Sequence, residues 1–277
     1  MRTDLHCHSS ASDGALTPRE VVQLARKRAI DIIALTDHDT IAGHAEALAA
    51  GLELGVRVIP GIEISALGKQ GETHVLGYGV EPEDEPTRAT LLALRATRES
   101  RARRILANLL RLGIAIDFNQ IKAIAGDGMI GRPHIARAML NRGAVSTTQE
   151  AFDVYLAEGK PAYAPNDALD PFQAIDLIHR ARGVAVLAHP AFTHGDVEAL
   201  LASMIRHGLD GIEAHYPQHT PEQTKRYAEI AREHGLLVTG GSDFHGLTPG
   251  AQFEFGETGL PAGTIEALDA RIAARRG

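Results

Sequence analysis

Short apolar runs of strand character alternate with helical patterns along this chain, and that alternation restricts the possible fold more than any other feature. Helices are predicted from Thr17, where Thr17 and Glu20 form a capping box around Pro18, and over residues 41–54, ending at Gly55. Such repetition predicts a barrel-like parallel sheet with helices packed against it. The first four predicted strands are "TDLHCH" (3–8), "DIIALTDH" (31–38), "VRVIPGIEIS" (56–65) and "THVLGYGV" (73–80).

After Val80 the pattern changes for roughly a hundred residues, which carry helical periodicity and no convincing strand. Strands then resume, and a last helix is predicted over residues 264–275. Seven strands interrupted by helices indicate one α/β barrel with a helical insertion rather than two domains in series. We place the barrel at residues 1–98 and 183–277 and the insertion at 99–182. The later strands are "VAVLAH" (184–189), "LDGIEAH" (209–215) and "LLVTGGSDFH" (236–245).

The composition of the 277-residue chain excludes several classes of protein. Its 44% of hydrophobic residues suffice for a full core. No run approaches the ~18 apolar residues of a membrane span, and the N-terminus lacks the apolar stretch of a signal peptide. The single cysteine, Cys7, excludes an internal disulfide and is interpreted as a packing residue. We therefore expect a cytoplasmic protein that does not associate with membranes.

Charge is unevenly distributed along the chain. The net charge of −7 argues against broad nonspecific binding to nucleic acid. From Arg88 to Arg142, however, eleven Lys and Arg outnumber three Asp and Glu, a balance of +8. This basic segment is either a set of solvated helix faces or a wall that attracts an anionic substrate, and the sequence leaves both interpretations open.

The stretch "LHCHSSASDG" (5–14) contains the first candidate ligands. His6 and His8 share one face only if the backbone is extended, because side chains alternate across a strand, and Cys7 then points the other way. With Asp13 reaching back from the following loop, the two histidines could bind a metal ion. By itself the pattern fits two surface histidines near a chain end equally well, since H-x-H is a short motif.

His, Asp and Glu residues recur at the ends of the predicted strands, where barrels carry their active sites. Six strand ends that supply such residues to one rim are not what structural burial alone produces. We expect metal ligation above all from His6, His8, His38, His74, His189 and His245. The same strand ends also supply Asp37, Asp39, Glu63, Asp243, His215 and His219. The histidines expected to be structural are His179, His194, His207 and His234.

The mixture of ligand types narrows the choice of metal. Imidazoles with carboxylates, and no second thiol, suit Zn²⁺, Mn²⁺ or Fe²⁺ in an open catalytic site better than a closed structural zinc site. The donors are too many for one ion. Several ions bridged by a carboxylate can lower the pKa of a shared water and clamp the oxygens of a phosphoryl group, as in multinuclear phosphoesterases.

Together, the motifs "DLHCHS", "TDHDT", "GIE", "HVLGY", "AHP" and "GSDFH" resemble those of the PHP (polymerase and histidinol phosphatase) family of metal-dependent phosphoesterases. They span residues 4–245 in this order, so the resemblance covers nearly the whole chain. It implies a distorted seven-stranded β/α barrel with three clustered metal ions. Many family members have histidine where this chain has Asp13. Transferred motif by motif, the ligands would be His6, His8, Glu63 and Asp243 for one ion, Glu63, His74 and His189 for a second, and Asp13, His38 and His245 for the third.

The helical insertion, with "GRPHIA" (131–136) inside it, resembles the family members that act as 3′,5′-nucleotide bisphosphatases, some of which also trim short RNA from its 5′ end. The resemblance implies a hydrolase that removes the 3′-phosphate of nucleoside 3′,5′-bisphosphates, with Mn²⁺ as its main cofactor and no protein partner. Arg132 and His134 would then hold a substrate phosphate, helped by the helix N-terminus as an anion site. The alternative for this motif is a plain helix start with Pro133 at its first position.

The resemblance suggests Asp37 and His215 for proton transfer, although Asp37 could almost equally well orient a ligand histidine. Two other functions compete with the bisphosphatase. Hydrolysis of histidinol phosphate would require the insertion to contact a cation, which a basic segment suits poorly. A regulatory metal-binding module that has lost catalysis would lack ligands, and none is missing from this sequence.

Overall fold

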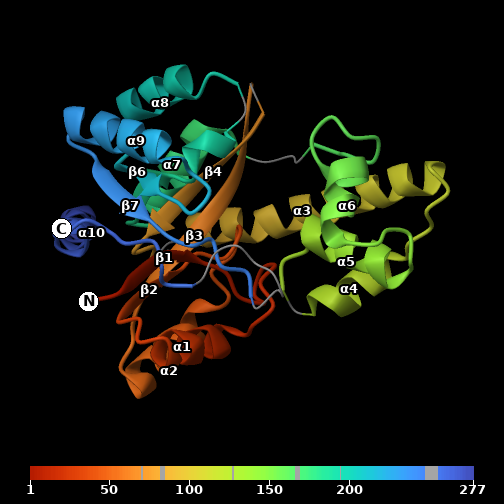
Figure 1. Ribbon diagram of the computed structural model, residues 1–277, viewed down its shortest axis with the longest axis horizontal. Coiled ribbons are helices and arrows are strands. Elements are labelled where there is room, and N and C mark those ends of the chain that lie inside the picture. The colour runs from red at the N-terminus through yellow and green to blue at the C-terminus, as the bar shows by residue number, and fades with distance from the viewer. Residues whose placement is uncertain (70, 82–84, 127, 166–168, 194, 247–254) are drawn as a thin grey trace.

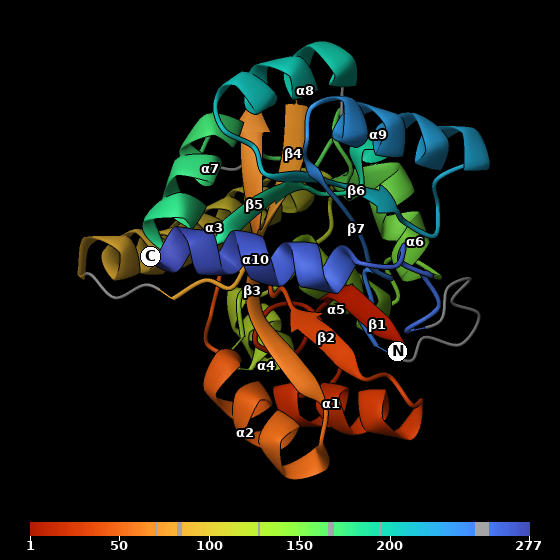
Figure 2. The ribbon, with the colours of Figure 1, turned by 90° about the vertical axis from the view of Figure 1, so that its left-hand side faces the viewer.

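Seven strands form one sheet in the order in which they occur in the chain. This computed structural model describes residues 1–69, 71–81, 85–126, 128–165, 169–193, 195–246 and 255–277. The sheet curls until Cys7, at the end of the first strand, forms a parallel bridge with Phe244, just after the last. The predicted seven-stranded β/α barrel is confirmed as a curled, partly closed sheet (Figure 2). The strands are β1 (Thr3–Cys7), β2 (Ile32–Leu35), β3 (Arg57–Gly68), β4 (Gly71–Tyr78), β5 (Val184–Leu187), β6 (Gly211–His215) and β7 (Leu237–Gly240).

One strand departs from the predicted parallel arrangement. β4 runs antiparallel to both β3 and β5, while the other neighbouring strands are parallel. The reason is local: β3 and β4 form a hairpin in which Gly68 pairs with Gly71, and a parallel neighbour would need a crossover of about a dozen residues. The reversal brings the first half of β4, with His74, to the rim at which the parallel strands end.

The helices of the barrel pack on the outside of the sheet and close its far end. α1 and α2 share one apolar core with β1 and β2, and α7, α8 and α9 share another with β3 to β6. α10 covers the interior at the end opposite the rim (Figure 2). The predicted capping box is present, since Thr17 accepts the Glu20 N–H and Glu20 accepts the Thr17 N–H. These helices are α1 (Pro18–Lys27), α2 (His44–Leu54), α7 (Pro171–Arg180), α8 (Val197–Arg206), α9 (Pro221–Glu233) and α10 (Thr264–Arg276), with a 3₁₀ turn, η2 (Pro190–Phe192).

The insertion forms a smaller lobe beside the rim of the barrel (Figure 1). It has its own apolar core, to which Ile105, Ile121 and Met139 contribute. α7 lies within the predicted limits 99–182 but packs on β3, β4 and β5, so we propose that the barrel resumes near Pro171. α3 (Glu85–Arg111) belongs to both lobes, because its first half packs in the core of the barrel and its second half in the core of the insertion. The rest of the insertion consists of α4 (Phe118–Ala125), α5 (Arg132–Asn141), α6 (Thr148–Ala151) and a π-helical turn, η1 (Phe152–Leu156). Within the described ranges, none of the helices has the length and apolar character needed to span a bilayer.

Candidate active site

The two histidines of the first motif lie at the end of β1, inside the barrel. His6 and His8 are completely buried, with ring centroids 5.1 Å apart. Cys7 is buried too, and its thiol lies 3.1 Å from the carbonyl oxygen of Ala34 on β2. Gly241 permits this packing, because a Cβ at that position would lie 2.3 Å from the Cβ of His6. Burial excludes the interpretation of the pair as surface histidines and confirms Cys7 as a packing residue.

Glu63 on β3 stands at the centre of the cluster, with its side chain 1% exposed. Its Oε2 faces three imidazole nitrogens at 3.2 to 3.3 Å, those of His6, His8 and His38. Its Oε1 faces two others, His74 Nδ1 at 2.8 Å and His189 Nε2 at 3.1 Å. The two oxygens of one buried carboxylate therefore face two different sets of imidazoles, as a ligand that bridges metal ions would.

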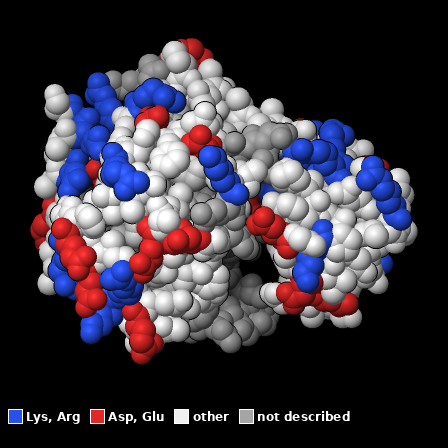
Figure 3. Space-filling model, turned by 90° about the horizontal axis from the view of Figure 1, so that it is seen from above, with Lys and Arg blue, Asp and Glu red and all other residues white. Residues whose placement is uncertain are grey.

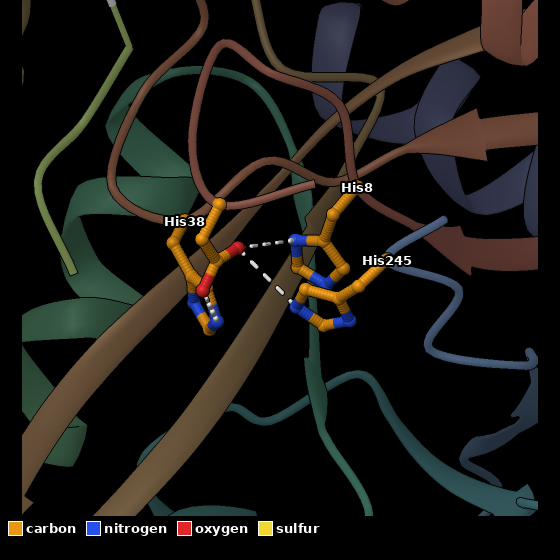
Figure 4. Close-up of side chains that lie close together, drawn as sticks. His8, His38 and His245 are labelled. Carbon is orange, nitrogen blue, oxygen red and sulfur yellow. Dashed lines mark ion pairs between the residues drawn. The ribbon is translucent and has the colours of Figure 1, made fainter. Parts of the chain in front are cut away.

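Asp13 reaches the cluster from the loop after β1. Its Oδ1 lies 3.2 Å from His245 Nε2 and 4.0 Å from His8 Nδ1, and its Oδ2 lies 3.9 Å from His38 Nε2. Figure 4 shows the rings of His8, His38 and His245 gathered around one point, although they come from three separate segments of the chain. The loop residue predicted to reach back toward the histidines does so.

Asp243, just after β7, completes the cluster on its opposite side. Its Oδ1 lies 3.3 Å from His6 Nε2 and 3.0 Å from His8 Nε2. Its Oδ2 accepts a hydrogen bond from the hydroxyl of Tyr216 at 3.0 Å. Nothing in the sequence singled out Tyr216, which immediately follows the end of β6.

Several donor atoms of the cluster lack a hydrogen-bond partner in the part of the chain that the structure describes. Buried nitrogen or oxygen atoms of His6, His8, Glu63, His189 and Asp243 have no hydrogen-bond partner among the described residues. Each would cost about 1–3 kcal/mol if left unsatisfied, and a coordinated cation removes that cost. Three sets have ligand atoms within 4.8 Å of one another: His6, His8, Glu63 and Asp243; His8, Asp13, His38 and His245; and His38, Glu63 and His74. The three sets contain eight of the nine predicted ligands, and the ninth, His189, lies outside them with its Nε2 3.1 Å from Glu63 Oε1. This collection of donors fits divalent metal ions.

The charge of the carboxylates also suits cations. Burial acts to raise the pKa of Glu63, but neighbouring imidazoles, chiefly His38 and His6, hold it well below its ordinary value. Burial likewise acts to raise the pKa of Asp13, but the imidazoles of His245, His38 and His8 together hold it well below its ordinary value. Burial would lower the pKa of His245, yet Asp13 and Asp243 together raise it to about 10. The carboxylates are therefore ionised at neutral pH, the form in which they bind metals.

Backbone strain is concentrated at the same rim. Asp39, His189 and Asp243 have φ values of 53°, 25° and 53°, in the region that side chains other than glycine rarely occupy. They follow β2, β5 and β7, where the chain leaves the sheet. His189 and Asp243 face the cluster, while Asp39 accepts the N–H of Ser65 at 2.9 Å and pairs with Arg98. Strain of this kind is typical of functional sites, where the surrounding structure enforces it.

Two buried carboxylates that sequence reasoning missed support the ligands. Glu213 on β6 has its Oε1 2.9 Å from His6 Nδ1, and its Oε2 accepts the N–H of His189 at 2.8 Å. Asp4 on β1 accepts the N–H groups of Ser242 at 2.9 Å and His6 at 3.2 Å. Such partners fix the orientation of a ligand ring. The available signal was an acidic residue inside an apolar strand, in "GIEAH" and in "TDLHC".

A pocket of about 190 Å³ adjoins the cluster between the barrel and the insertion, and we call it the arginine pocket. Its walls include Arg98 and Arg101 of α3 and Arg132 at the start of α5. Glu72 on β4 pairs with Arg101 Nη1 at 3.1 Å and with Arg132 Nη2 at 2.8 Å. These contacts hold the guanidinium groups of two helices against the sheet.

Three guanidinium groups and two carboxylates, those of Asp13 and Glu72, line the arginine pocket. Arg98 also pairs with Asp39 at 2.5 Å and donates to the hydroxyl of Ser65 at 2.6 Å. Figure 3 shows a hollow between the two lobes and Lys and Arg side chains gathered on the insertion. The sequence allows two interpretations of the basic segment, solvated helix faces or a wall that attracts an anionic substrate. The arginines of this pocket fit the second interpretation better. Arg98 and Arg101 were missed singly, although their i, i+3 spacing places them on one helix face.

The two residues predicted to bind phosphate lie at the start of α5. Arg132 lines the arginine pocket, with 21% of its side chain exposed. His134 is buried, and its Nδ1 accepts the N–H of Gly131 at 3.0 Å. That hydrogen bond is expected if "GRPHIA" is an ordinary helix start. Because Nδ1 accepts it, the proton of a neutral His134 lies on Nε2, from which it can be donated to an anion. The two interpretations of "GRPHIA" are therefore compatible for Arg132, whereas His134 is not among the residues that line the arginine pocket.

The two residues suggested for proton transfer differ in their surroundings. Asp37 accepts hydrogen bonds from the N–H and hydroxyl of Ser9, both at 2.7 Å, and from the hydroxyl of Ser12 at 2.6 Å. These contacts anchor the loop that carries Asp13, and they favour a positioning role for Asp37. His215 ends β6 and is half-buried, and burial lowers its pKa.

His179, His207, His219 and His234 serve the fold. His179 lies 2.9 Å from Asp210 and His207 lies 3.0 Å from Asp176, both by ring nitrogens. His219 is buried, with its Nδ1 2.9 Å from the carbonyl oxygen of Ala214. His234 is the C-terminal cap of α9. His194 lies outside the described residues.

Imidazole and carboxylate donors lie at the rim of a curled β/α sheet, and arginines face them. This arrangement defines a metal-dependent hydrolase of an anionic substrate.

A model of the PHP domain family matches residues 4–125. The chain is 39% identical to a 5′-3′ exoribonuclease from Haemophilus influenzae, over 87% of this chain and 89% of that protein. It is 38% identical to a 3′,5′-nucleoside bisphosphate phosphatase from Chromobacterium violaceum, over 87% and 86% respectively. The chain belongs to the PHP domain family.

Structural similarity agrees with this assignment. A solved structure from Bifidobacterium adolescentis, described as a metal-dependent phosphoesterase, matches with a TM-score of 0.88 and 34% identity, covering 97% of this chain and 96% of that one. The resemblance inferred from the motifs is confirmed, and the protein is a hydrolase of phosphoric ester bonds.

Proposed function

We propose that this protein hydrolyses the 3′-phosphate of nucleoside 3′,5′-bisphosphates, and that it also trims short 5′-phosphorylated RNA from the 5′ end. The observation that carries the proposal is the pairing of two separate sites, the donor cluster around Glu63, which would bind a phosphate through its metal ions, and the arginine pocket beside it. A substrate with two phosphates can occupy both at once. The names of the Haemophilus influenzae and Chromobacterium violaceum relatives support the same class of substrate.

For the cofactor we propose three divalent ions, with Mn²⁺ preferred to Zn²⁺ or Fe²⁺. The unsatisfied ligand atoms and the three overlapping donor sets support this number. When bound, such ions polarise phosphoryl oxygens and lower the pKa of a shared water. Glu63 would be shared between ions, because its Oε2 and Oε1 face different imidazoles. Glu213 and Asp4 keep the surrounding backbone and rings in place for them.

The second phosphate would be held by the insertion. Arg132 offers a guanidinium group to the arginine pocket, and Arg101 lies beside it on α3, joined to it through Glu72. His134 would donate from Nε2. Binding energy from a phosphate that does not react can orient the one that does, so this anchor should act on the rate as well as on affinity.

The orientation of the substrate decides the product. We place the 3′-phosphate at the metal cluster and the 5′-phosphate in the arginine pocket, so adenosine 3′,5′-bisphosphate should yield 5′-AMP and phosphate. Chromatography of the products with Mn²⁺ present tests this. Adenosine 3′-monophosphate, which lacks the anchoring phosphate, should be hydrolysed with a kcat/KM lower by orders of magnitude. Accumulation of 3′-AMP, or indifference to removal of the 5′-phosphate, would contradict the orientation.

The competing functions are less well supported. Histidinol phosphate carries an ammonium and an imidazole, and a pocket lined by Arg98, Arg101 and Arg132 would repel such cationic groups. A non-catalytic regulatory module would not need a complete set of ligands, and here all nine converge. Turnover of a panel of nucleotides, short 5′-phosphorylated RNA and histidinol phosphate separates these alternatives.

A further inference from the structure

A second cavity adjoins the metal cluster, and we call it the aromatic pocket. Its volume of about 280 Å³ is close to the lower end of the ~300–1,000 Å³ usual for small-ligand sites. His74 and His189 belong to its lining, so it reaches the candidate metal ligands. Phe152 of the insertion and Phe192 of the turn after β5 supply its aromatic surface. Neither phosphate of the proposed substrate is placed in this cavity.

The ion pair between Glu72 and Arg132 separates the aromatic pocket from the arginine pocket, because both residues line both cavities. Arg98 and Arg101 belong only to the arginine pocket. Apart from Glu158, the walls that belong to the aromatic pocket alone are formed by small, hydroxyl and aromatic side chains and by His189. A phosphate is therefore attracted to one cavity, and the other is left to the less polar part of a nucleotide.

Phe192 has the properties of a preformed stacking surface. Its side chain is 47% exposed, although three neighbouring rings fix its position. The centroid of Tyr216 lies 5.6 Å away, His219 is nearly parallel at 6.4 Å, and His189 meets it edge-on at 6.3 Å. A ring that is already held in place loses little freedom when a second ring covers it, so stacking on Phe192 has a small entropic cost.

We propose that Phe192 binds the nucleobase of the substrate by stacking. This inference rests on the proposed function, which places the 3′-phosphate at the metal cluster and the 5′-phosphate beside Arg132. The base of the same nucleotide is then directed to the aromatic pocket. Base–aromatic stacking contributes about 5- to 150-fold in affinity and tolerates every base. Phe192 should therefore distinguish a nucleotide from a sugar phosphate without a base, and should discriminate little between adenine and uracil.

Two measurements on Phe192→Ala test the proposal. In turnover assays with Mn²⁺, the KM for adenosine 3′,5′-bisphosphate should rise about 5- to 150-fold with little change in kcat. The preference for this substrate over base-free 1,2-dideoxyribose 3,5-bisphosphate should fall by the same factor. By calorimetry without metal, the affinity for adenosine 5′-monophosphate should fall toward that for ribose 5-phosphate. Phe192→Trp should restore both quantities, and Phe192→Leu, which keeps apolar surface without a ring, should not.

The matched control is Phe118→Ala, which makes the same substitution on α4, in a residue that lines neither pocket. It should leave KM and nucleotide binding unchanged. Nucleotide binding that is absent from the wild type, or equal in wild type and Phe192→Ala, would overturn the stacking proposal whether or not the enzyme is active. Wild-type protein that binds adenosine 5′-monophosphate through Phe192 but does not cleave the bisphosphate would instead overturn the proposed function and leave stacking in place.

Discussion

Replacement of Asp210 by asparagine should destabilise the protein at neutral pH, and the loss should fade in acid. Asp210 precedes β6, is 2% exposed, and has four polar partners. Its Oδ2 lies 2.9 Å from His179 Nε2 and accepts the N–H of Ala185 at 3.0 Å. Its Oδ1 accepts from Arg275 at 2.8 Å and Arg271 at 3.2 Å. Burial acts to raise the pKa of Asp210, but these partners lower it from 3.8 to about 2.

The size of the effect follows from this pKa shift. Because the folded state holds the Asp210 proton more weakly than the unfolded state, its contribution to the free energy of unfolding is fully present above the unfolded pKa of 3.8 and is lost as the pH falls through about 2. At ~1.4 kcal/mol per pH unit, the shift corresponds to about 2 kcal/mol at neutral pH. Roughly half of that should remain at pH 3.

Urea unfolding of the wild type and Asp210→Asn at pH 7, 4 and 3 measures this difference. The matched control is Asp269→Asn, whose carboxylate pairs with Arg57 while the two side chains are 41% and 46% exposed. An exposed pair should contribute less than about 1 kcal/mol. Equal losses in the two variants, or a loss in Asp210→Asn that is the same at pH 7 and pH 3, would refute the reasoning that burial and ionisation of Asp210 set the magnitude.

Three further predictions concern the active site. Glu63→Gln should lower both metal content and turnover, because one amide cannot offer an anionic oxygen to each side of the cluster; full metal by elemental analysis with near-normal turnover would contradict the assigned ligands. Arg132→Ala should cost roughly 2 to 4 kcal/mol in kcat/KM for a nucleotide bisphosphate, and its metal content should not change. The control is Arg103→Ala, on the exposed face of α3. Equal turnover of wild type and Arg132→Ala would mean that Arg132 only begins the helix. Glu213→Gln should weaken metal binding by about 10- to 100-fold through misorientation of His6, measured by competition with a chelator; unchanged affinity would show that Glu213 does not position that ligand.

Much of the candidate metal centre could be predicted from the sequence because strand ends of one sheet meet at one rim. His6, His8 and Asp243 needed only the alternation of side chains and the position of the strand end. Glu63 could be expected as a bridging ligand because a carboxylate has two oxygens. The hairpin that makes β4 antiparallel was not recognised, yet His74 reached the predicted place, since the reversed strand has its first half at that rim.

The residues that surround the metal ligands could not be predicted in the same way. Whether Arg98 and Arg101 face the metals depends on the direction in which α3 crosses the rim, and helical periodicity fixes a face but not its orientation in space. The role of Glu72 likewise could be assigned only once its ion pairs with Arg101 and Arg132 were seen. Glu213 was visible as a charge in a buried strand, but its partner lies over two hundred residues away in the chain.

α3 also limits how the enzyme can move. Leu91 and Leu94 of this 27-residue helix pack in the core of the barrel, while Ile105 and Leu109 pack in the core of the insertion. One continuous helix, about 40 Å long at 1.5 Å per residue, therefore joins the two lobes without a hinge. An opening of the insertion would have to bend that helix. Substrate should instead enter and leave laterally past stationary walls, and kcat should be insensitive to solvent viscosity.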